Sequence, residues 1–82
     1  MIYLLGSNGK IGRNIAKFFM TKKISFQPVT KESDNNNLGF NQFINIAPFE
    51  KNVLIINTAI LNNSDFKSLI VVSFYITIEK YN

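Results

Sequence analysis

Two residue types with strong chemistry are missing from this sequence. It has no cysteine and no histidine among its 82 residues. Without cysteine the chain can form no disulfide and no thiolate metal site, and without histidine it lacks the commonest metal ligand and general base. We therefore expect no metal site in this chain, and no catalysis by cysteine or histidine.

Long apolar runs and dense blocks of charge are also absent. The longest apolar-rich stretch, Leu69–Ile78, is interrupted by two polar residues and falls short of the roughly 18–20 residues that span a bilayer. Glycine and polar residues follow Met1–Leu5 at once, which argues against a secretion signal. The net charge of +4 is mild and the lysines are dispersed, unlike a nucleic-acid-binding arm. We expect a cytoplasmic protein with no membrane and no nucleic-acid partner.

What the sequence does contain is a globular composition, with 46% hydrophobic and 17% charged residues. At 82 residues it forms one small domain or part of a larger one. A chain of this size buries only about 60% of its unfolded surface, so its margin of stability is thin.

The most informative stretch is the glycine-rich turn, Gly6–Gly12, which reads Gly-Ser-Asn-Gly-Lys-Ile-Gly. It follows the continuous apolar run Ile2–Leu5, a pattern typical of a buried parallel strand, and it opens a helical pattern that runs to about Lys23. Gly6 suits a tight turn, Gly9 leaves no Cβ between backbone and ligand, and Gly12 allows close packing of helix on strand. The unpaired N–H groups of such a helix start favour an anion.

Further along the chain the pattern predicts a second strand over Ser25–Thr30, shortened by a proline, and a polar loop over Lys31–Gly39. Phe40–Ala47 fits a short strand or a helical turn equally well. Val53–Ile56 is a clear strand, again apolar on both faces. Phe66–Tyr81 has the β-branched content of a strand but the length of a helix, and we assign it as a helix on its length.

This alternation predicts an α/β fold, a partial Rossmann-type parallel sheet with flanking helices. Ligands of such sheets bind at the carboxyl ends of the strands. Three segments meet that edge: the glycine-rich turn, Thr30-Lys31 and Asn57-Thr58-Ala59. Lys31 favours the 2′-phosphate of NADP over NAD, although a solvated lysine at a loop start is a competing interpretation, and Asn57-Thr58-Ala59 fits either a cofactor crevice or simple strand termination.

The glycine spacing after Ile-Tyr-Leu-Leu, together with Leu54–Ala59 some forty-five residues later, resembles the extended short-chain dehydrogenase/reductases. Within them it is most similar to the NAD-dependent epimerase/dehydratase group that acts on nucleotide sugars. The resemblance implies a single NAD(P)-binding domain over residues 1–82, with hydride transfer belonging to the parent family. It also implies that the chain stops before the family's Tyr-x-x-x-Lys motif, so we expect no turnover from this chain alone.

The expected cofactor, NADP or NAD, would contact the following residues: Gly6, Asn8, Gly9, Lys10, Ile11, Gly12, Thr30, Lys31, Asn57, Thr58 and Ala59. The acidic residue that contacts adenine in the family has only Asn41 or Gln42 as substitutes here. A non-catalytic nucleotide- or protein-binding module, or a fragment without function, remains an alternative. Because the family's fifth strand is missing from the expected elements, Val53–Ile56 would form an open sheet edge through which the chain self-associates.

Overall fold

A central parallel sheet organises the chain. The computed structural model describes residues 1–46, 52–59, 64 and 76–77. Its five strands are all parallel and lie in the order β3-β2-β1-β4-β5. Their bounds are Ile2–Leu5 for β1, Gln27–Thr30 for β2, Leu38–Gly39 for β3, Leu54–Asn57 for β4 and Ile76–Thr77 for β5. The expected α/β class, a partial Rossmann-type sheet with flanking helices, is confirmed.

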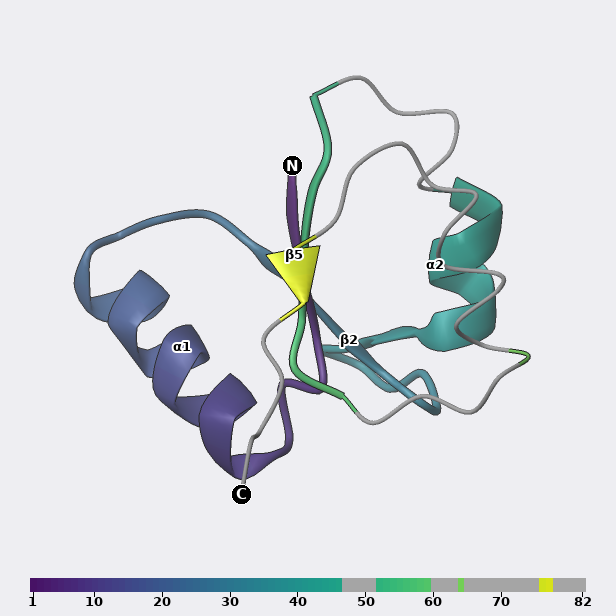
Figure 1. Ribbon diagram of the computed structural model, residues 1–82, viewed down its shortest axis with the longest axis horizontal. Helices are drawn as coiled ribbons and strands as arrows, with labels where there is room; N and C mark the ends of the chain where they lie inside the picture. Colours follow the sequence, from purple (N-terminus) through teal and green to yellow (C-terminus); the bar gives the residue numbers. More distant parts are fainter. Residues whose placement is uncertain (47–51, 60–63, 65–75, 78–82) are drawn as a thin grey trace.

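Two helices flank this sheet, α1 (Lys10–Thr21) and α2 (Phe40–Ile46). They lie on opposite sides of the strands, α1 to the left and α2 to the right in Figure 1. The strand order explains this arrangement, because the chain passes from β1 outward to β2 and β3 and then returns past β1 to β4. The reversal makes the carboxyl ends of β1 and β4 the topological switch point, where ligands bind in open α/β sheets.

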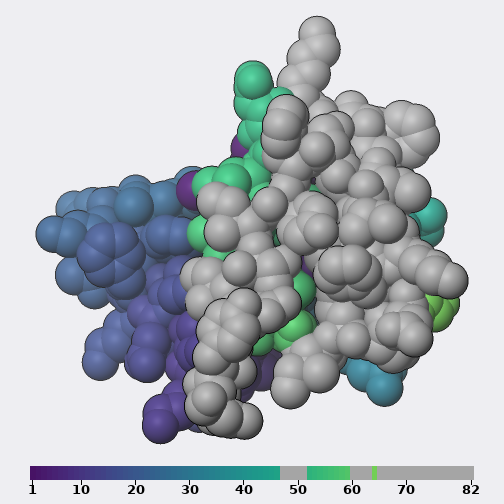
Figure 2. Space-filling model, in the orientation of Figure 1, coloured from purple at the N-terminus to yellow at the C-terminus, as the bar shows by residue number. Residues whose placement is uncertain are grey.

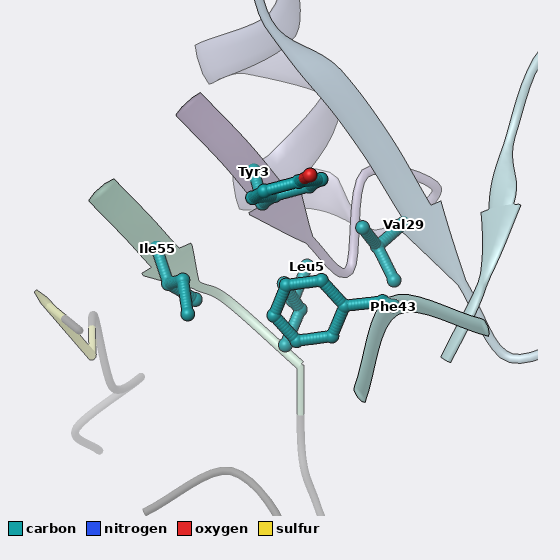
Figure 3. Packing of buried hydrophobic residues seen from close by; sticks show 5 residues of the cluster. All are labelled: Tyr3, Leu5, Val29, Phe43 and Ile55. Carbon is teal, nitrogen blue, oxygen red and sulfur yellow. The ribbon is translucent and has the colours of Figure 1, made fainter. Parts of the chain in front are cut away.

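The best-packed core lies on the α2 side of the sheet. Five buried side chains form it: Tyr3, Leu5, Val29, Phe43 and Ile55. Figure 3 shows Phe43 reaching from α2 toward the side chains of three neighbouring strands. Its ring meets the ring of Tyr3 edge-on, with 5.0 Å between centroids. This cluster fixes α2 and holds β1 between β2 and β4.

Helix α1 covers the opposite face of the sheet and is followed by two lysines, Lys22 and Lys23. Its only buried residue is Gly12. The Phe18 side chain on this helix is 54% exposed. The Lys22 ammonium lies 6.0 Å from the centre of the Phe18 ring. Lys23 then takes a left-handed conformation (φ 57°) that terminates the helix.

In two neighbouring segments the structure adds to what the sequence predicted: one differs from the prediction, and in the other an open alternative is resolved. Leu38–Gly39, expected to end a loop, forms β3 because it pairs with Val29 and Thr30 of β2. Phe40–Ile46, for which strand and helical turn were both open, is a helix. The Gln42 side-chain oxygen accepts a hydrogen bond from Gly39 N–H at 3.1 Å, which caps the helix start in the manner of a capping box.

The expected helix over Phe66–Tyr81 is wrong at Ile76-Thr77, which form β5 parallel to β4. The rest of that segment lies outside the described residues. The pairing joins Ile56 to Ile76 and Asn57 to Thr77, so β4 is an interior strand with β1 on its other side. The premise of self-association through an open β4 edge is therefore also wrong. At these two residues β-branched character prevailed over the length argument, because a partner strand, β4, is available across the sheet.

Candidate functional site: the glycine-rich turn at the switch point

The glycine-rich turn connects the end of β1 to the start of α1. Gly9 N–H donates to the Gly6 carbonyl at 3.0 Å, which closes the turn. Gly6 N–H donates to the Val29 carbonyl of β2 at 3.1 Å, so the turn is tied to a second strand. Figure 1 shows β1 and β4 running in the same direction toward the end of the sheet at which α1 begins. The turn thus lies at the switch point.

Gly6 is required by the fold itself. Its φ of +81° belongs to the left-handed region that glycine adopts without strain. A Cβ at this position would lie 2.7 Å from both Ala59 N and Thr58 Oγ1, closer than packed atoms approach. The absence of a side chain therefore lets the end of β4 lie directly against the turn.

Gly12 is required for a different contact. It is the buried residue of α1, and a Cβ here would overlap the Gly6 carbonyl oxygen and lie 2.7 Å from the Gly6 carbonyl carbon. The Cα of Ser7 would be only 2.8 Å away. Helix α1 can sit this close to the turn only because residue 12 has no side chain.

Gly9, by contrast, is not required by any described neighbour. Its dihedral angles (φ −77°, ψ 171°) are extended backbone that any residue adopts. A Cβ would approach only the Gly6 carbonyl oxygen, at 3.4 Å, an ordinary contact distance. Gly9 is also exposed, so its missing side chain leaves the backbone accessible from outside.

The first turn of α1 presents free backbone donors. Gly9 is the N-cap and offers no side-chain cap, and the first turn carries no acidic residue. Within the described part of the chain, no acceptor is found for the N–H groups of Lys10, Ile11 or Gly12. Figure 2 shows purple atoms of the segment that opens α1 at the surface, at the lower left. These donors and the positive end of the helix dipole favour an anion here.

Ser7 is a feature of the turn that the sequence reasoning missed. Its side chain is 7% exposed, and its hydroxyl is buried with no hydrogen-bond partner among the described residues. Buried hydroxyls are nearly always paired, so an unpaired one inside a turn with free N–H donors is unusual. The one sequence signal that could have indicated this burial was the position of Ser7 between Gly6 and Asn8, inside a tight turn that encloses a short side chain.

The end of β4 is closed by its own hydrogen bonds. Thr58 Oγ1 donates to the Leu5 carbonyl at 2.7 Å and Thr58 N–H donates to the same oxygen at 2.9 Å. The buried Asn57 side-chain oxygen accepts from Ala59 N–H at 3.0 Å. These bonds give Asn57 and Thr58 a structural role, and their contact with a cofactor stays a prediction. They also bring Thr58 and Ala59 against Gly6, as the sequence reasoning expected of this edge.

The end of β2 is more open. Thr30 Oγ1 donates to the Glu32 carbonyl at 2.6 Å, which turns the chain after the strand, and Lys31 is exposed. In the following loop, hydrogen bonds from the Asn37 side chain and from the N–H groups of Asn36 and Asn37 hold the pKa of the Asp34 carboxyl below its ordinary value. The Asp34 carboxylate is thus engaged within its own loop, whereas the exposed Lys31 side chain has no hydrogen-bond or ion-pair partner in the part of the chain that the structure describes.

Comparison with protein-family models, with curated proteins and with solved structures gave no match for this chain. In the described residues we find no cluster of metal-ligating side chains and no helix with the length and apolar character needed to cross a bilayer.

Proposed function

We propose that the chain binds a dinucleotide, NADP or NAD, with the pyrophosphate at the glycine-rich turn. The observation that carries this proposal is the contrast among the three glycines. Contacts within the chain explain why Gly6 and Gly12 lack a side chain, but nothing in the described residues explains Gly9. A phosphate can approach the backbone at residue 9 only if that residue has no Cβ, as glycine does.

Two further features support an anionic ligand at this position. The N–H groups of Lys10, Ile11 and Gly12 point out of the helix start without acceptors among the described residues, and oxygen atoms of a pyrophosphate would satisfy them. The Lys10 side chain is exposed at the same place and adds positive charge.

The parent activity that fits this site is that of a nucleotide-sugar epimerase, dehydratase or reductase, of which this chain would supply the cofactor-binding half. The strand order and the switch point support the comparison with Rossmann-type enzymes. No catalytic residue is proposed within this chain. Its role would be to hold the dinucleotide, and hydride transfer would require groups from elsewhere.

The proposal predicts that NADPH stabilises the protein and that Gly9→Val removes the effect. A ligand at 100 times its Kd adds about 2.7 kcal/mol to the free energy of unfolding. Thermal unfolding with and without NADPH measures this for both proteins. Because a Cβ at residue 9 meets no close neighbour, the ligand-free variant should remain folded.

A matched control is Asn45→Val, which places the same side chain at an exposed position in the last turn of α2, away from the glycine-rich turn. This variant should keep the full stabilisation by NADPH. Equal unfolding temperatures of the unsubstituted protein with and without NADPH would contradict the proposed function.

The exposed Lys31 predicts a preference for NADPH over NADH that Lys31→Ala abolishes. A hydrogen bond assisted by charge contributes about 1.5–3 kcal/mol, or roughly ten- to a hundredfold in affinity. Calorimetric titration of both cofactors against both proteins provides the test, with NADH affinity as the internal control. A preference for NADH in the unsubstituted protein would show that an acidic side chain such as Glu32 contacts the ribose instead.

A further inference from the structure

The glycine-rich turn contains a dipeptide with chemistry of its own. The sequence has twelve asparagines, and Asn8 is the one followed by glycine. In an Asn-Gly pair the backbone nitrogen of the glycine can attack the asparagine side-chain carbonyl, since no Cβ on the following residue obstructs the approach. The reaction converts the amide to a carboxyl group.

The structure leaves this pair accessible. Asn8 and Gly9 are both exposed and precede the first residue of α1. No hydrogen bond restrains the Asn8 side chain within the described residues, so it can rotate toward the backbone. Among the residues that the structure describes, the Gly9 N–H makes one hydrogen bond, to the Gly6 carbonyl at 3.0 Å, which closes the turn. Opening that single bond frees the nitrogen for attack.

We propose that Asn8 is a site of spontaneous deamidation that switches off anion binding at the turn. The Gly9 nitrogen loses its proton and bonds to Cγ of Asn8, and the side-chain nitrogen leaves as ammonia, which gives a cyclic succinimide. Water then opens the ring at either carbonyl to give aspartate or isoaspartate. Water is the only co-reactant, and no oxidation or reduction takes place.

The new carboxylate lies one residue before the N-cap of α1. At that place in the chain it adds a negative charge next to the start of α1, whose free N–H groups favour an anion. It therefore either takes the place of a phosphate at these N–H groups or repels a phosphate that approaches them. The same charge interacts favourably with the helix dipole, so the modified protein should stay folded while it loses its anionic ligand. This consequence rests on the proposed function.

A bound dinucleotide should also slow the reaction. A pyrophosphate held by the N–H groups next to Gly9 would keep the turn closed, and the bond from Gly9 N–H to the Gly6 carbonyl would open less often. Deamidation of Asn8 would then take place mainly in ligand-free protein and slowly in the ligand-bound form.

The first test follows the amide itself. The full chain is incubated at mildly alkaline pH, and peptide mapping by mass spectrometry measures conversion at each asparagine. The exposed Asn35 and Asn36 are internal controls that lack a following glycine. We expect Asn8 to convert first, and more slowly with NADPH present. Conversion of Asn35 or Asn36 at the same rate as Asn8 would overturn the proposal.

The second test follows binding. Asn8→Asp should lower the affinity for NADPH by at least about tenfold, a loss on the scale of one hydrogen bond to a charged group, without lowering the unfolding temperature. The neutral variant Asn8→Gln measures the loss that comes from replacing the asparagine without adding charge, and Asn8→Asp should bind NADPH at least about tenfold more weakly than Asn8→Gln. Equal affinities of Asn8→Asp and Asn8→Gln would overturn the switch. If the unsubstituted protein does not bind NADPH, the proposed function fails and the switch fails with it, whereas the conversion of Asn8 is still measured by mass.

Discussion

Gly12→Ala is expected to destabilise the fold by about 3 kcal/mol, the upper end of the usual cost of overpacking. The added Cβ would overlap the Gly6 carbonyl, which is backbone and cannot rotate away as a side chain would. Relief requires α1 to move off the turn. Total stabilities are roughly 0.05–0.15 kcal/mol per residue, so this loss is a large share for a domain of 82 residues. Urea denaturation followed by circular dichroism measures it.

Gly9→Ala is the matched control for this change. It adds the same methyl group three residues earlier, where the nearest described atom is the Gly6 carbonyl oxygen at 3.4 Å. We expect a loss of no more than about 1 kcal/mol, the ordinary cost of placing alanine at an N-cap. Equal losses in the two variants would contradict the distinction drawn between glycines that the fold requires and the one that it does not.

Phe43→Ala is expected to cost about 3–5 kcal/mol, the range measured for removal of a buried aromatic ring. Phe43 is fully buried and contacts the ring of Tyr3, and it links α2 to the strands in the centre of the sheet. The loss is large enough to leave much of the protein unfolded at room temperature. Chemical denaturation, if needed in a stabilising salt or osmolyte, gives the difference in free energy.

The control for this prediction is Phe18→Ala, which removes the same ring from a position that is 54% exposed. Its cost should be much smaller, because little of the ring is withdrawn from water in the folded state. A cost for Phe18→Ala that matches that of Phe43→Ala would show that the packed core is not on the α2 side of the sheet.

The parts of the fold that the sequence predicted are those whose signal is local. Ile2–Leu5 and Val53–Ile56 are continuous apolar runs next to turn residues, and both became interior strands. The two-residue strands Leu38–Gly39 and Ile76–Thr77 carry no such pattern. These two strands exist because they pair with strands that lie elsewhere in the chain. A two-residue stretch of sequence contains no information about which strand it pairs with.

The candidate site was predictable in outline for a similar reason. Three glycines between a strand and a helix indicated the turn, but their spacing could not separate Gly6 and Gly12, which the fold requires, from Gly9, which it does not. That separation depends on Thr58, Ala59 and the Gly6 carbonyl, all brought into place by tertiary structure. The buried Ser7 hydroxyl was missed because burial inside a turn is not visible in a polar sequence.

The central claim is that the backbone N–H groups at the start of α1 hold the phosphates of a dinucleotide. Titration of NADPH into isotope-labelled protein, followed by heteronuclear NMR, tests it residue by residue. We expect saturable shifts of the Gly9, Lys10, Ile11 and Gly12 amides, while the amide of Asn45 in the last turn of α2 stays unchanged. Unchanged amides at the start of α1 under saturating NADPH, or shifts confined to another surface, would contradict it.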